Sequence, residues 1–183
     1  MKNTLLVLLL AALPLAGQAA DELNYNYVEA DYANLDHGTD GPALRGSVDI
    51  GKTGLYVTGS YAWLNADGTP DDFNVRAHEL GLGYHYGVAA NTDLIGELAY
   101  RKAEGGGSSV EGGRASVGVR SAFGKRVEGF VKGNYYEAGD YHGDATGTLG
   151  GQYKFNSTWG ATAEAELGHG DQAYLVGVRA SFK

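Results

Sequence analysis

The stretch that decides the fold is Tyr174-Leu175-Val176-Gly177-Val178-Arg179-Ala180-Ser181-Phe182, close to the end of the chain. Successive side chains of a β-strand point to opposite faces, so every second residue shares a face. One face carries the charged Arg179, whereas the other is wholly apolar or aromatic. The apolar face consists of Tyr174, Val176, Val178, Ala180 and Phe182. A strand with one apolar and one charged side suits the wall of a barrel in lipid, because its outer face meets hydrocarbon and its inner face meets water.

The same alternation recurs along the whole chain, with turn residues between the runs. It predicts an all-β fold, an antiparallel up-and-down transmembrane β-barrel of about ten strands. Eight strands is the alternative if two runs merge. An even number places both ends of the chain on the periplasmic side. The predicted strands lie near residues 24–34, 43–51, 55–64, 75–86, 93–102, 114–123, 127–137, 147–155, 158–167 and 174–182.

The predicted connections alternate between short and long. Gly51-Lys52-Thr53-Gly54 and Gly124-Lys125-Arg126 are tight turns. Short turns on the periplasmic side and longer loops outside are typical of an outer-membrane barrel. The longer connections, rich in Gly and Asp, are 35–42, 65–74, 103–113, 138–146 and 168–173.

The beginning of the chain has the pattern of an export signal. Lys2 precedes an apolar run from Leu5 to Leu15, and small residues precede Asp21. This run is shorter than the ~20 residues that a membrane-spanning helix needs. We therefore expect residues 1–20 to be a signal peptide, cleaved after Ala19 or Ala20, and residues 21–183 to form the barrel domain in a bacterial outer membrane.

Composition narrows the remaining classes. The 183 residues include 30 Gly and 13 Tyr but no Cys, and the net charge is −8. A mean hydropathy of −0.26 is too low for a helical membrane protein. The absence of cysteine excludes disulfides and thiolate zinc sites. Because an acidic chain repels phosphate, we expect no nucleic-acid partner, and we find no motif for a cofactor or for catalysis.

The face opposite the apolar one carries eight acidic and seven basic side chains, which predicts a charge network in the lumen. Buried charges persist only when they are paired or hydrated, and small barrels have interiors largely filled by side chains. The sequence therefore disfavours a wide, open pore. The predicted network comprises Glu29, Asp31, Asp49, Glu79, Glu97, Glu128, Glu164 and Glu166 with Arg45, Arg101, Arg114, Arg120, Lys132, Lys154 and Arg179.

Aromatic residues near the strand ends fit a girdle at the membrane boundary, where an apolar ring with a polar tip is favoured. These residues are Tyr32, Trp63, Tyr86, Tyr100, Tyr135 and Trp159. Alternation alone also fits a soluble barrel of the lipocalin type, with its apolar face inside. The leader, the aromatic Phe182 and the alternating connection lengths favour the membrane.

Three predicted outer loops repeat a histidine–glycine theme, with an aspartate nearby. His37, His142 and His169, with Asp144 and Asp171, are candidates for a weak metal site or for activating water. Turn chemistry is the favoured alternative, because Gly and Asp build tight turns. We therefore expect no bound metal.

Gly46-Ser47-Val48-Asp49-Ile50-Gly51-Lys52-Thr53 matches a phosphate-binding loop letter for letter. That loop must join a buried strand to a helix. Here strand-like alternation lies on both sides, so we do not expect nucleotide binding.

Leu23-Asn24-Tyr25-Asn26-Tyr27-Val28-Glu29-Ala30-Asp31-Tyr32 resembles the first strand of a particular family. This family comprises small outer-membrane β-barrel proteins of xanthomonad-type gammaproteobacteria, once described as activators of a plant immune receptor. The leader residues Ala11-Ala12-Leu13-Pro14 and the stretch Asp72-Phe73-Asn74 are also similar, while the terminal Lys183 departs from the usual aromatic end. The resemblance implies the fold and location, and it assigns no catalytic residue.

Three functions remain open at this stage. The first is a structural or surface-interaction role, with acidic loops displayed to a host or phage partner. The second is a narrow diffusion channel for small solutes, and the third is a rim metal-binding or hydrolytic site. We expect a monomer in contact with outer-membrane lipid and lipopolysaccharide, assembled by the barrel-assembly machinery through its closing strand.

Overall fold

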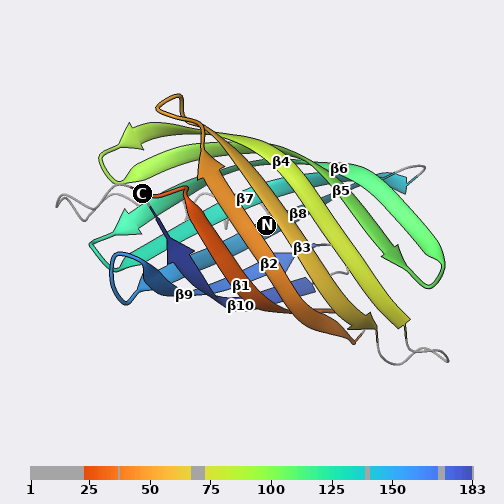
Figure 1. Ribbon diagram of the computed structural model, residues 1–183. Coiled ribbons are helices and arrows are strands. Elements are labelled where there is room, and N and C mark those ends of the chain that lie inside the picture. The colour runs from red at the N-terminus through yellow and green to blue at the C-terminus, as the bar shows by residue number, and fades with distance from the viewer. Residues whose placement is uncertain (1–22, 37, 67–72, 139–140, 169–171, 183) are drawn as a thin grey trace, which may run out of the picture.

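The computed structural model describes residues 23–36, 38–66, 73–138, 141–168 and 172–182. Ten antiparallel strands close into a single barrel and cross its wall obliquely (Figure 1). The prediction of ten strands rather than eight is confirmed. Across these ranges, no helix is long and apolar enough to cross a membrane.

Each strand pairs with its neighbours in the sequence, and the first strand pairs with the last. The strands are β1 Tyr27–Leu35, β2 Thr39–Asp49, β3 Leu55–Ala66, β4 Phe73–Ala89, β5 Thr92–Gly105, β6 Ser108–Phe123, β7 Val127–Ala138, β8 Tyr141–Lys154, β9 Trp159–Leu167 and β10 Gln172–Ser181.

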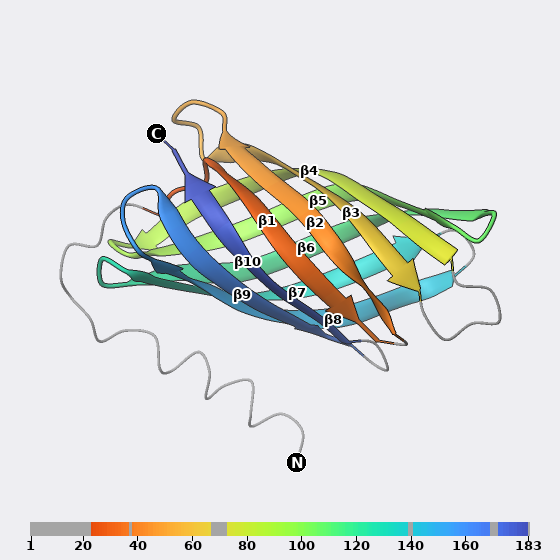
Figure 2. The same ribbon diagram turned by 60° about the horizontal axis from the view of Figure 1, so that its bottom comes forward.

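The barrel closes where β1 runs antiparallel to β10, from the pair Tyr27–Ser181 to the pair Leu35–Ala173 (Figure 2). Closure pairs the two edges that an open sheet would leave exposed. In lipid this matters because an unpaired backbone group has no water to bond with.

Three of the predicted long loops are much shorter than expected. β1 ends at Leu35 and β2 already begins at Thr39, inside the predicted loop 35–42. β5 continues to Gly105 and β6 begins at Ser108, so only Gly106 and Gly107 form the turn. Their φ angles of 58° and 78° lie in the left-handed region that two-residue hairpin turns require. Likewise, β7 ends at Ala138 and β8 begins at Tyr141. The backbone ladder continues through Ser- and Gly-rich stretches whose side chains give no alternation signal.

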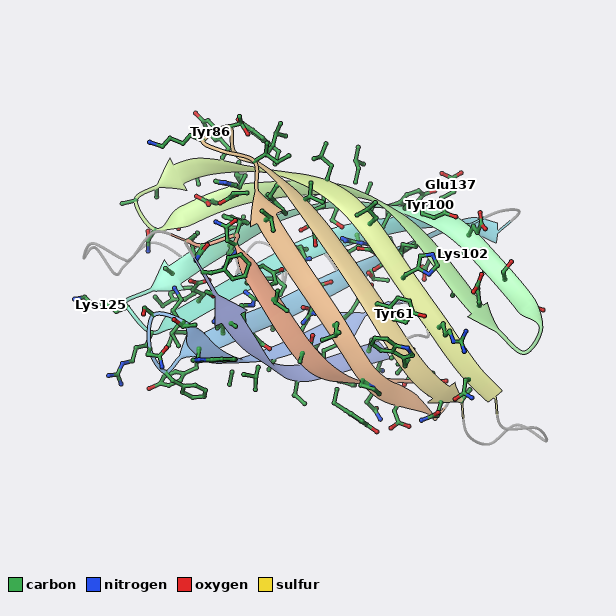
Figure 3. All side chains as sticks on the ribbon, in the orientation of Figure 1. Tyr61, Tyr86, Tyr100, Lys102, Lys125 and Glu137 are labelled. Atoms are coloured by element: carbon green, nitrogen blue, oxygen red, sulfur yellow. The ribbon has the colours of Figure 1, made fainter. Side chains whose placement is uncertain are left out.

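The apolar side chains point out of the barrel and the charged ones point in. Leu98 and Val117 are each 69% exposed, whereas Glu29 is 0% exposed. Figure 3 shows side chains projecting around the outside of the wall. This arrangement is the reverse of the soluble lipocalin type, which would bury its apolar face.

Polar groups mark where the outward apolar band ends. On β5 the aromatic Tyr100 is followed by Lys102 and Glu104 on the same outward face. Lys102 Nζ lies 2.7 Å from Glu104 and 3.4 Å from Glu111 on β6. Figure 3 shows Tyr100 and Lys102 near one end of the barrel. We take this change as the outer boundary of the apolar band.

Candidate functional site: the charged lumen

Arg45 of β2 is the hub of the charge cluster in the middle of the lumen. Its Nη2 donates to Glu29 Oε1 at 2.5 Å, and its Nε donates to Asp31 Oδ2 at 2.9 Å. Its Nη1 donates to Glu164 Oε2 at 2.6 Å. Glu29 also accepts a hydrogen bond from Arg179 of β10. These contacts join β1, β2, β9 and β10 across the line where the barrel closes.

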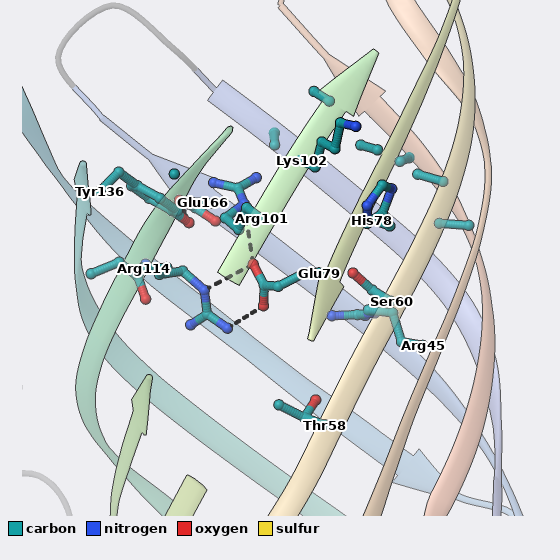
Figure 4. Close-up of a pocket in the computed structure, with 18 of the residues that line it drawn as sticks. Arg45, Thr58, Ser60, His78, Glu79, Arg101, Lys102, Arg114, Tyr136 and Glu166 are labelled. Carbon is teal, nitrogen blue, oxygen red and sulfur yellow. Dashed lines mark hydrogen bonds and ion pairs between the residues drawn. The ribbon is translucent and has the colours of Figure 1, made fainter. Parts of the chain in front are cut away.

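A second cluster lies on the opposite wall, around Glu79 of β4 and Glu97 of β5. Arg114 Nη2 donates to Glu79 Oε1 at 2.5 Å, and its Nη1 donates to Glu97 Oε2 at 2.9 Å. Arg101 Nε lies 3.1 Å from Glu79 (Figure 4). Lys132 Nζ lies 3.5 Å from Glu97. Both clusters are built from residues that the sequence placed on the inner face.

A third cluster lies toward the end of the barrel where β1 begins and β10 ends. Arg120 Nη2 donates to Glu128 Oε2 at 2.5 Å, and Lys154 also pairs with Glu128. Arg120 donates in addition to the backbone oxygen of Asn24 at 3.0 Å. Its guanidinium lies 4.6 Å from the ring centroid of Tyr25. This cluster therefore holds the segment that precedes β1.

That segment folds into the mouth of the barrel at this same end. Tyr25 is only 3% exposed, and its ring stacks on His85 at 4.2 Å between centroids. Its hydroxyl donates to Asp93 Oδ2 at 2.9 Å, and its ring lies 4.9 Å from that of Tyr56. Leu23, Tyr25, Tyr56 and Ile95 form an apolar cluster that narrows the mouth. We call residues 23–26 the plug.

The plug corrects the predicted first strand, because β1 begins at Tyr27 rather than at residue 24. Leu23-Asn24-Tyr25-Asn26 alternates like a strand in the sequence. In the structure the ladder to β10 begins at the pair Tyr27–Ser181, and the preceding residues turn inward. Sequence reasoning therefore missed Tyr25 and its contact His85, although their aromatic character is a signal that could have raised the question.

Two predicted members of the charge network lie outside the ion-pair clusters. Asp49 Oδ1 is 3.4 Å from His85 Nε2, so this carboxylate faces the plug. Glu166 accepts hydrogen bonds from the Tyr136 hydroxyl and the Thr146 hydroxyl, each at 2.6 Å. Among the described residues, Glu166 has no cationic partner.

The lumen contains two cavities in series. The larger, about 420 Å³, reaches outward to Leu35 at the end of β1. The smaller, about 60 Å³, lies against Tyr25 of the plug. Five residues line both cavities, and we call these five the constriction. Its members are Tyr27, Arg45, Glu97, Lys132 and Glu164.

The histidine candidates at the rim stay predictions. His37, His169 and Asp171 lie outside the described residues, as does the side chain of His142. Asp144 lines a further cavity at the outer mouth, and its Oδ1 accepts a hydrogen bond from the Ala145 amide at 2.8 Å. In the part of the chain that the structure describes, no cluster of three His, Asp or Glu residues could hold a metal.

The stretch that matches a phosphate-binding loop occupies β2 and the turn to β3. Strand β2 ends at Asp49, and Thr53 Oγ1 donates to the backbone oxygen of Ile50 at 2.7 Å within the turn. Strand β3 then begins at Leu55, where a phosphate-binding loop would require a helix.

Comparison with known proteins identifies the fold. No family model and no curated protein sequence matches the chain. The solved structure of KdgM porin is similar at a TM-score of 0.55 and 15% identity, over 86% of this chain and 99% of that one. The structure of NanC porin is similar at a TM-score of 0.52 and 13% identity, again over 86% of this chain and 99% of that one. The chain therefore shares the closed β-barrel fold of these two porin structures.

A third similar structure is the translocator domain of autotransporter NalP from Neisseria meningitidis. It gives a TM-score of 0.51 at 14% identity, over 97% of this chain and 93% of that one. A porin and a translocator thus share this architecture at low identity. The likeness therefore identifies the fold alone, and the function must be argued from the lumen.

Proposed function

We propose that the chain is an outer-membrane β-barrel whose lumen forms a pathway for small polar solutes, narrowed at its periplasmic end by the plug. The observation that carries this proposal is the series of two cavities joined at one constriction. A barrel serving only as a surface scaffold does not need a cavity of about 420 Å³ above its central charges. The proposal therefore favours the second of the three functions considered from the sequence.

The charges of the constriction suit small solutes of either sign. Arg45 and Lys132 oppose Glu97 and Glu164, so the positive and negative side chains are equal in number. A field from paired opposite charges falls off quickly and gives little steering of a single-charged ion. KdgM porin has been solved in complex with disordered oligogalacturonate. The balanced constriction of this chain does not by itself favour such a polyanion.

The apolar outward band supports a place in the outer membrane, in contact with lipid and lipopolysaccharide. The alternating strand β10 supports the role of an assembly signal read by the barrel-assembly machinery. A closed barrel with no free sheet edge supports a monomer. Membership of the xanthomonad-type family, the signal peptide and the absence of catalysis belong to the same proposal.

The test is the current through single barrels in a planar bilayer. We expect small, steady steps from the unaltered protein and steps several-fold larger from Tyr25→Ala, because this change removes the ring that fills the periplasmic mouth. Tyr86→Ala is the matched control, since Tyr86 points outward and is 60% exposed. The heat-dependent gel shift of intact barrels verifies folding. Silence from both folded variants would refute the pathway.

A surface-interaction role is the second candidate, and the β5–β6 hairpin favours it. This hairpin continues beyond Tyr100 to the turn at Gly106 and Gly107, and it presents Lys102, Glu104 and Glu111. Replacing residues 104–109 by a two-residue Asn-Gly turn, which joins the paired residues Ala103 and Val110, should abolish binding to a host or phage partner and leave bilayer currents unchanged. Retained binding by the shortened barrel would count against this role.

A further inference from the structure

Arg101, Tyr136 and Glu166 occupy a wall shared by two cavities. All three line the lumen cavity of about 420 Å³. All three also line the further cavity at the outer mouth beside Asp144, which has a volume of about 400 Å³. Both volumes fall in the range of roughly 300–1,000 Å³ that small-molecule sites have in proteins. A solute that enters from outside therefore meets these side chains before it reaches the constriction.

Arg101 has hydrogen-bonding capacity that its neighbours do not use. Its Nε pairs with Glu79, which also binds Arg114 through both carboxylate oxygens. The Arg101 side chain is 47% exposed, and its guanidinium lies 4.5 Å above the ring of Tyr136. Its two terminal nitrogens have no partner among the described residues. A guanidinium in this state is suited to bind a carboxylate through two parallel hydrogen bonds.

Glu166 is the matching anion at the other end of the same tyrosine. The Tyr136 and Thr146 hydroxyls both donate to Oε1, which leaves Oε2 without a partner in the described part of the chain. Arg101 and Glu166 do not pair with each other, although Tyr136 contacts both. Figure 4 shows Arg101, Tyr136 and Glu166 together on one side of the cavity. The tyrosine thus holds a cation and an anion apart.

We propose that Arg101, Tyr136 and Glu166 bind a small zwitterion of the size of a free α-amino acid. Its carboxylate accepts hydrogen bonds from the free nitrogens of Arg101, and its ammonium group donates to Oε2 of Glu166. The inference rests on the proposed pathway, since it names a solute class that the pathway takes.

A ligand with only one charge fits this site less well. A simple carboxylate at Arg101 meets repulsion from Glu166, and a simple amine at Glu166 meets repulsion from Arg101. Like charges brought together in a partly desolvated cavity oppose binding. A zwitterion meets an attractive partner at both ends, so the site discriminates by requiring two opposite charges in one molecule.

The experiment measures binding to refolded full-length barrel in detergent by saturation-transfer nuclear magnetic resonance. The probes are L-alanine, acetate and ethylammonium, which carry both charges, the negative charge alone and the positive charge alone. We expect L-alanine to bind at least tenfold more tightly than either single-charge probe. Equal binding of acetate or of ethylammonium would overturn the proposal.

Variants locate the site and separate it from the pathway. Arg101→Gln and Glu166→Gln should each weaken L-alanine binding at least tenfold, whereas Arg76→Gln, an exposed arginine of β4 outside both cavities, should leave it unchanged. If both Arg101→Gln and Glu166→Gln still bound L-alanine as tightly as the unaltered protein, the site would be refuted. Binding without bilayer current would leave the site standing and refute the pathway, and current without binding would refute the site alone.

Discussion

The outer and periplasmic halves of the lumen share one barrel wall but differ in how their charges are used. In the outer half, Arg101 and Glu166 face cavities with unused donors and acceptors. In the periplasmic half, Tyr25 stacks on His85 and receives Arg120 against its ring. One half is open to solutes, and the other is narrowed by aromatic packing.

This difference shows that the narrow end of the lumen is filled by residues that do not belong to any strand. The ten strands build a tube, and a short segment before β1 fills one end of it. The hydrogen bond from the Asn24 side chain to the backbone oxygen of Phe182, at 2.9 Å, ties that segment to the end of the chain. Changes in the plug should therefore alter this narrowing with little effect on the wall.

The largest expected effect is a loss of stability, and it should be much greater for a substitution in the central cluster than for one in the outer half. Glu29→Gln leaves Arg45 and Arg179 without a charge that both of them contact at a fully buried position, so we expect a loss of about 3–5 kcal/mol in the free energy of unfolding. Glu166→Gln retains an oxygen for the two hydroxyls and should cost about 1 kcal/mol or less. Urea unfolding in lipid vesicles measures both. Equal losses would erase the distinction between the halves.

The next effect concerns the packing under the plug. A Cβ added at Gly83 would lie 2.2 Å from the ring of Tyr56, and the Tyr56 hydroxyl is held by Glu97 at 2.9 Å. We expect Gly83→Ala to destabilise the barrel by about 1–3 kcal/mol, as overpacking does. Gly147→Ala is the control, because its Cβ would meet nothing within 4 Å. The same unfolding assay applies, and an unchanged Gly83→Ala would show that this packing is loose.

Much of the fold could be predicted from the sequence because the strands alternate between apolar side chains that point outward and charged ones that point into the lumen. The faces of β10 follow directly from Tyr174 to Phe182. The extension of β5 and β6 toward Gly106 could not be predicted, since pairing there depends on backbone bonds and not on side-chain pattern. The sequence likewise does not show where backbone pairing of an alternating segment begins. Residues 23–26 alternate like a strand but precede the first pair, Tyr27–Ser181, so the plug was not predicted.

The charged residues of the candidate site could be placed on the inner face from the sequence, but their pairing and their aromatic partners could not. Asp49 and Glu166 lie on the inner face as alternation requires, yet they sit near His85 and Tyr136 rather than in the ion-pair clusters. Which charges meet depends on the stagger of strands around the whole barrel, and no single strand encodes it.

A smaller effect concerns ion selectivity at the constriction. Lys132 has one long ion pair, at 3.5 Å to Glu97, so Lys132→Met should leave the fold intact and shift permeability toward cations severalfold. Glu97→Gln should shift it toward anions. Lys125→Met, in the turn between β6 and β7, is the control and should leave the permeability ratio unchanged. Reversal potentials under a salt gradient measure the ratio; unchanged potentials would place the limiting charges elsewhere.

The smallest effect is expected at the outer hairpin, beyond the apolar band. The hydrogen bond from Lys102 lowers the pKa of Glu104 below its ordinary value of 4.5. Hydrogen bonds from Tyr100 and then Lys102 also lower the pKa of Glu111. A lowered pKa stabilises the folded hairpin at neutral pH, and this contribution disappears as the pH falls through the lowered values.

We therefore expect a slight loss of hydrogen-exchange protection in acid at Gly105 and Ser108, which pair at the end of this hairpin, after correction for intrinsic exchange rates. The loss should be absent in Lys102→Met. An equal loss in that variant would assign the pH dependence to other groups.

The measurement that tests the central claim most directly uses the absence of cysteine from the chain. Ala43 and Ser47 lie on the same inner face of β2. Ala43 lines the cavity of about 420 Å³, and Ser47 lines the cavity of about 60 Å³ against the plug. Reaction rates of Ala43→Cys and Ser47→Cys with a charged, water-soluble thiol reagent report access to each cavity. The account predicts fast reaction at position 43, at least tenfold slower reaction at position 47, and acceleration at position 47 when Tyr25→Ala is added. Equal rates in the unaltered background, or no acceleration, would contradict a lumen narrowed by the plug.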